Sequence, residues 1–168
     1  MCIRDRVDSG KLASDQRMAF GVYMENTPEF LFASFGAALS NSVLFAINTG
    51  FRGDILGKVM EQAGISFLIV NDSTLKEVEG VVKNVNIIGP ENIYVVREGE
   101  KSLPDGFQWL DKAVEEAQQI DVPNRYRVRV DNFSPVIVIY TSGTSGMPKG
   151  VPCTHIKMFG AGFVVQSA

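Results

Sequence analysis

The residues best suited to chemistry gather in one short segment, residues 140–150, near the end of the sequence. The segment reads Tyr-Thr-Ser-Gly-Thr-Ser-Gly-Met-Pro-Lys-Gly. Glycines let backbone N–H groups approach a polyanion, hydroxyls add neutral donors, and a lysine adds a mobile positive charge. Residues of these three kinds are Gly143, Gly146, Gly150, Thr141, Ser142, Thr144, Ser145 and Lys149. The combination predicts a binding site for the polyphosphate of a nucleotide.

Other motifs fit this spacing less well. The phosphate loop of common nucleoside triphosphatases requires Gly-Lys-Ser/Thr, whereas Lys149 lies between Pro148 and Gly150. A serine hydrolase requires Gly-x-Ser-x-Gly, which the segment lacks. A flexible Ser/Gly linker is disfavoured because the apolar run at residues 136–139, rich in β-branched residues, predicts a buried strand directly before the segment.

Residues 140–150 resemble the Tyr-Thr-Ser-Gly-Thr-Thr/Ser-Gly-x-Pro-Lys-Gly signature of the adenylate-forming superfamily. The resemblance extends over the full length of the signature. This superfamily includes acyl-CoA synthetases, luciferases and the adenylation domains of peptide synthetases. Residues 24–30 and 47–53 are similar to the N-terminal subdomain of fatty-acyl and carnitine-type CoA ligases. The resemblance covers nearly all of the chain between Gly21 and His155, and it implies part of the N-terminal domain of an AMP-forming ligase.

The resemblance implies a two-step reaction. A carboxylate attacks the α-phosphorus of ATP, with Mg²⁺ as cofactor, and the resulting acyl-adenylate then passes its acyl group to coenzyme A. Residues 141–146 would hold the β- and γ-phosphates, Lys149 would be the catalytic cation that neutralises departing pyrophosphate, and Gly150 would close the loop. The loop is expected to join two strands, with residues 150–153 in the second. The remaining site residues, including any metal ligand, are expected beyond Ala168, so the fragment alone should be inactive.

The sequence defines the identity of the acid substrate less well than it defines the type of reaction. The charge-free stretch after Phe30, with the Asn-Thr and Arg-Gly pairs that follow it, favours a fatty or carnitine-like acid. Two alternatives remain open: an adenylation domain that loads a carrier protein instead of coenzyme A, and a non-catalytic nucleotide- or phosphate-binding module. The sequence does not indicate an oligomeric state.

Several single residues have a structural interpretation that outweighs a functional one. Ser145 stands where the superfamily more often has threonine, and it keeps the hydroxyl. Cys153 stands where an apolar residue is usual and is interpreted as a small apolar filler. His155, the only histidine, is interpreted as a hydrogen-bonded structural residue rather than a catalyst. A solvated charged face is favoured over an anion site for Arg125, Arg127 and Arg129.

The elements that must position the loop follow from the spacing of apolar residues. A period of two predicts strands, and a one-sided apolar stripe predicts helices. The predicted strands are residues 18–24, 43–47, 67–70, 93–96 and 136–139, and the predicted helices are residues 28–39, 55–63, 75–85 and 109–117. This alternation is typical of an α/β domain, a layered and largely parallel sheet with flanking helices. Trp109 and its apolar neighbours are expected in the core.

Helix ends carry their own signals. Thr27 is a suitable N-cap before Pro28, and Gly64 is a suitable C-terminal stop. Thr74 with Glu77 predicts a capping box.

One uncharged stretch, residues 30–51, has the length of a membrane span, which needs roughly 20 apolar residues. The polar cluster Ser40-Asn41-Ser42 divides it, so a buried helix followed by a buried strand is predicted instead. No transmembrane span is expected, and peripheral membrane contact remains open.

Composition limits the partners and the compartment. The 168 residues carry 16 Lys and Arg against 19 Asp and Glu, a net charge of −3, which disfavours nucleic-acid binding. Two cysteines are too few for a disulfide framework and favour a reducing, cytoplasmic location.

Both ends of the sequence look truncated. Residues 1–6 resemble a translated sequencing adapter and contain no secretory signal, so they are set aside. The apolar run at residues 159–165 stops without a cap or breaker. Residues 7–168 are therefore expected to be an incomplete N-terminal domain, cut at both ends.

Overall fold

The computed structural model describes residues 17–84, 87–99, 102–117, 132–141, 147–158 and 160. The strands are β1 (Ala19–Tyr23), β2 (Val43–Ala46), β3 (Leu68–Asn71), β4 (Ile93–Val96), β5 (Gln108–Trp109), β6 (Pro135–Thr141) and β7 (Lys149–Thr154). The helices are α2 (Pro28–Leu39), α3 (Gly53–Ala63), α4 (Leu75–Val82) and α5 (Leu110–Glu116), with a 3-10 turn, η1 (Pro90–Asn92). Each predicted strand and helix is present, with ends shifted by a few residues.

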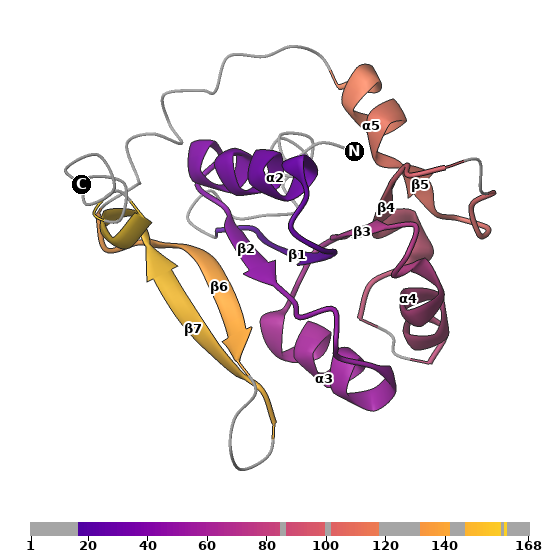
Figure 1. Ribbon diagram of the computed structural model, residues 1–168, viewed down its shortest axis with the longest axis horizontal. Helices are drawn as coiled ribbons and strands as arrows, with labels where there is room; N and C mark the ends of the chain where they lie inside the picture. The colour runs from indigo at the N-terminus through magenta and orange to yellow at the C-terminus, as the bar shows by residue number, and fades with distance from the viewer. Residues whose placement is uncertain are drawn as a thin grey trace.

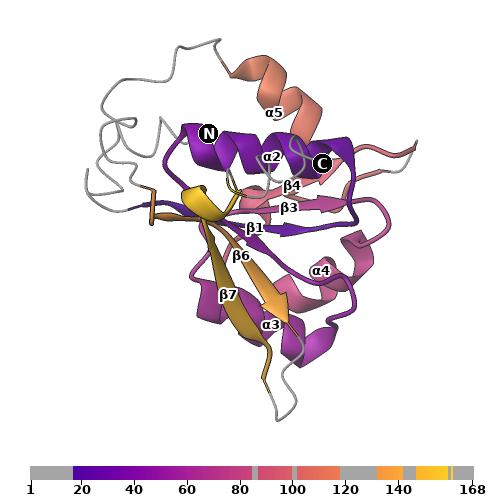
Figure 2. The same cartoon turned by 60° about the vertical axis from the view of Figure 1, so that its left-hand side comes forward.

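The described strands form one seven-stranded sheet in the order β5-β4-β3-β1-β2-β6-β7 (Figure 1). Neighbouring strands are parallel except for β6 and β7, which are antiparallel. Helices lie on both faces of the sheet (Figure 2). The prediction of a layered α/β domain with a largely parallel sheet is therefore confirmed.

The order of the strands creates a switch in direction at the centre of the sheet. From β1 the chain passes through α2 to β2, and then crosses through α3 to β3 on the other side of β1. As a result, the helices that follow β1 and β3 lie on opposite faces (Figure 2). In open α/β sheets, ligands bind outside the carboxyl ends of the strands near such a point. The carboxyl edge of β3, β1, β2 and β6 is therefore where a site is expected.

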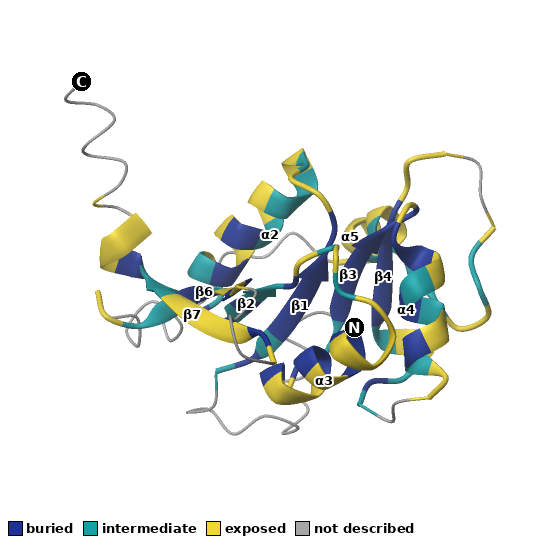
Figure 3. Cartoon of the chain, turned by 60° about the horizontal axis from the view of Figure 1, so that its bottom comes forward, coloured by how far each residue is buried: buried dark blue, intermediate teal, exposed yellow. Residues whose placement is uncertain are grey.

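The two faces of the sheet have separate cores. Helices α3 and α4 cover one face, where Leu56, Val59 and Val78 are fully buried. Helices α2 and α5 lie over the other face, where the rings of Phe20 and Phe67 stack at 4.8 Å between centroids. Among the described strands, β1, β3 and β4 are the most deeply buried, whereas β2 is mostly of intermediate burial (Figure 3).

The helix in the uncharged stretch is not buried, contrary to the prediction. Of the residues in α2, only Ser34 and Ala37 are buried. The exposed apolar side chains of this helix are Leu31, Phe32, Phe35 and Leu39, which are 57%, 70%, 61% and 56% exposed. Because α2 has no polar stripe, its sequence does not reveal that only one side faces the sheet. Among the described residues, no helix is long and apolar enough to cross a membrane.

The helix ends follow the predictions only in part. Gly64 ends α3 in the left-handed conformation at φ 58°, as predicted. Thr27 is the N-cap residue of α2, but its hydroxyl donates to Met24 Sδ at 3.6 Å and caps no backbone N–H. The prediction of a capping box at Thr74 and Glu77 is wrong, because the Thr74 hydroxyl caps no backbone N–H of α4. It donates instead to the Tyr23 carbonyl in β1 and to the Asn71 side-chain oxygen in β3.

The last predicted helix is also less buried than expected. No residue of α5 is buried, and Val114 is 63% exposed. Trp109 is half-buried at the end of β5, with the Arg97 guanidinium 4.2 Å from its ring centroid. The ring thus packs at the margin of the core and not inside it.

Candidate functional site

The predicted phosphate-binding segment begins and ends in an antiparallel hairpin. β6 and β7 pair with Thr141 opposite Lys149 and Tyr140 opposite Gly150. This confirms that the loop joins two strands and that residues 150–153 lie in the second. The tip of the hairpin, residues 142–146, falls outside the described residues, so the expected roles of Ser142 through Gly146 stay predictions.

The neck of the hairpin brings two predicted site residues together. The side chains of Thr141 and Lys149 are exposed, and the Thr141 hydroxyl donates to the Lys149 carbonyl oxygen at 3.4 Å. Because β6 is parallel to β2, β6 ends and β7 begins at the carboxyl edge of the sheet (Figure 1). A lysine and a threonine therefore flank the entry to the loop at the edge where ligands are expected.

The last glycine of the segment has a packing role. A Cβ atom on Gly150 would lie 2.8 Å from Val138 Cγ1 and 3.6 Å from Tyr140 Cε1. No other side chain fits at this position of β7 without movement of its neighbours. The sequence predicts Gly150 as part of the phosphate loop, and the close approach of Val138 adds a separate packing requirement for glycine in the hairpin.

Buried residues anchor the hairpin to the domain. Val136 is fully buried, and Tyr140 is 5% exposed with its ring 6.3 Å from that of Phe45. Burial raises the pKa of the Tyr140 hydroxyl above its ordinary value. Ile139, by contrast, is 49% exposed, so the strand predicted as buried is buried only in part. The loop nevertheless begins from a rigid support.

A cleft of about 400 Å³ lies beside the hairpin, at the carboxyl ends of β1, β2 and β6. The segments that follow β1 and β2 form one part of the lining, which includes the polar residues Glu25, Asn48 and Thr49 beside the apolar Met24 and Ile47. The opposite wall is formed by β6 and includes Ile139 and Tyr140. The cleft thus shares a wall with the strand that leads into the predicted phosphate loop.

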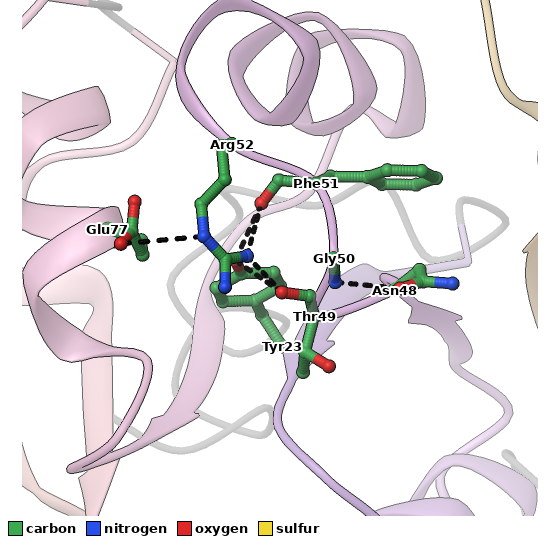
Figure 4. Close-up of polar contacts among 7 residues, drawn as sticks. All are labelled: Tyr23, Asn48, Thr49, Gly50, Phe51, Arg52 and Glu77. Carbon is green, nitrogen blue, oxygen red and sulfur yellow. Dashed lines mark hydrogen bonds and ion pairs between the residues drawn. The ribbon is translucent and has the colours of Figure 1, made fainter.

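A cluster of hydrogen bonds holds the segment after β2 in place (Figure 4). Arg52 Nη1 donates to the Tyr23 hydroxyl at 2.7 Å, to the Phe51 carbonyl at 2.9 Å and to the Thr49 carbonyl. Arg52 Nε also lies 3.4 Å from a carboxylate oxygen of Glu77 in α4. Burial is the main cause that raises the pKa of Tyr23, and the nearby Arg52 charge acts in the opposite direction. The sequence analysis did not predict this cluster. The only signal for it in the sequence was the Arg-Gly pair that follows the Asn-Thr pair.

The remaining candidates have structural surroundings. His155 is 7% exposed, and its backbone N–H donates to the Ser134 carbonyl at 3.2 Å, in keeping with a structural role. Cys153 is half-buried and packs against the core on the α2 side, as an apolar filler would. The arginines at positions 125, 127 and 129 lie outside the described residues. Within the described ranges no group of three His, Cys, Asp or Glu residues could hold a metal ion, so we assign no Mg²⁺ ligand here.

Comparison with known proteins identifies the family. The family model for AMP-binding enzymes matches residues 12–166. The chain belongs to the AMP-binding enzyme family. This confirms the predicted resemblance to the adenylate-forming superfamily, and enzymes of this family use ATP and coenzyme A, typically with Mg²⁺.

Relatives within the AMP-binding family include acid–CoA ligases. The chain is 32% identical over 145 residues to the medium/long-chain-fatty-acid–CoA ligase FadD17 of Mycobacterium tuberculosis, covering 86% of this chain and 24% of that protein. It is 30% identical over 177 residues to the acetyl-coenzyme A synthetase of Mycolicibacterium smegmatis, covering 96% and 17%. The chain therefore spans about a quarter or less of these relatives.

Solved structures agree on the fold of this AMP-binding chain. An acyl-CoA synthetase of Brucella canis superposes with a TM-score of 0.70 at 19% identity, covering 94% of this chain and 27% of that one. The anthranilate CoA ligase AuaEII, in complex with anthranoyl-AMP, gives a TM-score of 0.69 at 19% identity, covering 89% and 27%. At these identities the likeness establishes the arrangement of sheet and helices.

Proposed function

We propose that this chain is the N-terminal part of an AMP-forming acid–thiol ligase that activates a carboxylic acid and passes it to coenzyme A. The observation that carries the proposal is the hairpin, whose neck brings Thr141 opposite Lys149 at the carboxyl edge of the sheet. The family signature runs through this hairpin, and the relatives named above include CoA ligases. We further propose a cytoplasmic location.

In the proposed first step, a carboxylate oxygen attacks the α-phosphorus of ATP. The bond from the α-phosphorus to the bridging oxygen breaks, and pyrophosphate leaves with the electron pair. An ionised carboxylate needs no general base, so the protein acts mainly through positioning and charge stabilisation. Residues 141–146 and Gly150 form the loop around the β- and γ-phosphates, and Lys149 stabilises the charge that develops on pyrophosphate.

In the proposed second step, a thiol sulfur attacks the carbonyl carbon of the acyl-adenylate, the bond from that carbon to the AMP oxygen breaks, AMP leaves with the electron pair, and the thiol proton is released to solvent. A fatty or carnitine-like acid is the proposed substrate. The support is the uncharged stretch after β1 and the fatty-acid ligase among the relatives. Coenzyme A is the proposed acceptor because two of the relatives are named as CoA-dependent enzymes.

The test separates the two steps in the intact ligase that contains this chain. Lys149→Ala should slow acid-dependent ATP–pyrophosphate exchange by about 100-fold or more, since it removes a charge that stabilises the transition state. Thioester formation from a supplied acyl-adenylate should slow far less. Lys157→Ala, at an exposed lysine shortly beyond β7, is the matched control and should leave both rates near the wild-type values. Equal slowing of both steps by Lys149→Ala would contradict the assigned role.

The same assays decide between the remaining alternatives. Transfer of the acyl group to a carrier-protein thiol but not to coenzyme A would identify a carrier-loading adenylation domain. Binding of ATP without any acid-dependent exchange would identify a non-catalytic phosphate-binding module. Exchange with a series of acids of increasing chain length would show whether a fatty acid is preferred.

A further inference from the structure

We infer that Arg52 is a positioning residue that holds the segment from Asn48 to Phe51 as one wall of a substrate-binding cleft. The inference rests on the proposed function, because it gives the cleft beside the phosphate hairpin a substrate to hold. It concerns the cleft of about 400 Å³ between this segment and β6.

The first argument is the number of groups that converge on one guanidinium. Arg52 donates to two backbone carbonyls of its own segment, those of Thr49 and Phe51, and to the Tyr23 hydroxyl (Figure 4). The Tyr23 hydroxyl in turn donates to the Phe51 carbonyl at 2.7 Å. Tyr23 is fully buried at the end of β1, so the segment is tied to the centre of the sheet.

The second argument is that the ion pair with Glu77 does not explain this arrangement. The two side chains are 52% and 42% exposed, and their closest atoms are 3.4 Å apart. Exposed pairs of this kind contribute little, because water and salt screen the charges. The rigid guanidinium plane, by contrast, directs Nη1 toward the acceptors of the segment while Nε faces Glu77, an arrangement that a lysine ammonium on a flexible stem does not reproduce.

The third argument is that the rest of the segment is fixed as well. The Thr49 hydroxyl donates to Glu25 at 2.6 Å, and the Gly50 N–H donates to the Asn48 side-chain oxygen at 2.7 Å. The Phe51 N–H donates to the Asn48 carbonyl at 3.0 Å. These hydrogen bonds support the arrangement in which Asn48 and Thr49 line the cleft.

The position of the cleft links this arrangement to substrate binding. Its opposite wall includes Ile139 and Tyr140, which immediately precede the phosphate loop. Glu25 gives the cleft an acidic lining and disfavours a phosphate there. The occupant is therefore a part of a substrate that carries no negative charge, with apolar groups toward β6 and hydrogen-bonding groups toward Asn48 and Thr49.

The experiment compares four variants of the intact ligase. Arg52→Ala removes all the contacts, Arg52→Lys keeps the charge without the fork, and Glu77→Gln removes only the ion pair. Arg97→Ala is the matched control, because Arg97 is also half-exposed and pairs with one carboxylate, that of Asp111, at 3.3 Å. Amide hydrogen exchange at residues 50 and 51 is measured without substrates, and kcat and KM are measured for the acid, ATP and the thiol.

Arg52→Ala should speed exchange at residues 50 and 51 and raise the KM for one substrate by about tenfold, with kcat little changed, because several hydrogen bonds to the segment are lost. The substrate whose KM rises is the occupant of the cleft. Arg52→Lys should keep most of this rise, whereas Glu77→Gln and Arg97→Ala should behave like wild type.

Three results would overturn the inference. They are unchanged exchange at residues 50 and 51 in Arg52→Ala, a parallel change of kcat with every KM, and a Glu77→Gln variant that reproduces Arg52→Ala. Absence of acid-dependent pyrophosphate exchange in the wild-type enzyme would contradict the proposed function instead. The hydrogen-exchange result would still decide whether Arg52 fixes the segment.

Discussion

The two helical layers of the sheet differ in how completely they bury their apolar residues. In the α3/α4 layer, Leu56, Val59 and Val78 are fully buried. In the α2/α5 layer, Phe32 and Val114 are 70% and 63% exposed. Both layers rest on the same strands, so the difference comes from the helices themselves. Helices α3 and α4 present a polar side to the solvent and an apolar side to the sheet, whereas α2 has no polar side and the short α5 has no buried residue.

The looser layer also leaves open space. Apolar hollows of about 270 and 670 Å³ lie between α2 and α5, lined by residues of both helices and of the sheet. The hollows are open to solvent, so side chains around them have fewer neighbours than those in a close-packed interior. Stability should accordingly depend on the α3/α4 layer far more than on the α2/α5 layer.

The largest effect is expected from a matched pair of leucine truncations. Leu56→Ala in α3 should lower the free energy of unfolding by about 2–5 kcal/mol, because it leaves a cavity in a fully packed core. Leu31→Ala in α2, where the leucine is 57% exposed, should have a much smaller effect. Urea unfolding of both variants checks this. Equal losses would show that α2 is as tightly packed as α3.

A second pair compares the threonines before two helices. Thr74→Ala should lower the free energy of unfolding by about 1–3 kcal/mol, since its buried hydroxyl bonds to the Tyr23 carbonyl and the Asn71 side chain at 2.9 and 2.8 Å. Thr27→Ala should matter less, because that hydroxyl meets only the sulfur of Met24 among the contacts identified. Thermal and urea unfolding measure both. A larger loss for Thr27 would reverse the contrast between the layers.

The smallest effect is a gain in stability. A Cβ added at Gly36 in α2 meets no atom within 4 Å, so Gly36→Ala should raise the free energy of unfolding by about 0.5–1 kcal/mol through helix propensity alone. Gly21→Ala in β1 is the matched opposite, because its Cβ would lie 2.6 Å from Leu68 Cδ1 on the α3/α4 side. A lower free energy of unfolding for Gly36→Ala would mean that the α2/α5 layer has no space for an added methyl group.

Much of this fold could be predicted from local sequence patterns. Apolar alternation predicted β1, a one-sided stripe predicted α3, and Gly64 predicted where α3 ends, because each depends on neighbours in the chain. The exposure of α2 could not be predicted, since a helix without polar residues gives no sign of which side meets the sheet. The capping box suggested at Thr74 is absent because the hydroxyl bonds instead to the Tyr23 carbonyl in β1 and to Asn71, and the contact with β1 could not be seen in the local sequence.

The candidate site also contains a part that the sequence predicts and a part that only the fold brings together. The glycines, hydroxyls and lysine of the hairpin are contiguous in sequence, so their pattern was visible. The Arg52 cluster joins residues from β1, the segment after β2 and α4, and no local pattern shows that these meet. Gly150 was recognised for its backbone, while the close approach of Val138 became apparent only from the pairing of β6 with β7.

The pairing of β6 with β2 has a consequence for how the site forms as the chain folds. Leu44 lies beside Ile137, although more than half of the chain's length separates them. Closing so long a loop is entropically unfavourable and slow, whereas the β6–β7 hairpin needs only nearby residues. The hairpin is therefore expected to form early and to dock late, after β1, β2 and β3 have assembled an edge to receive it.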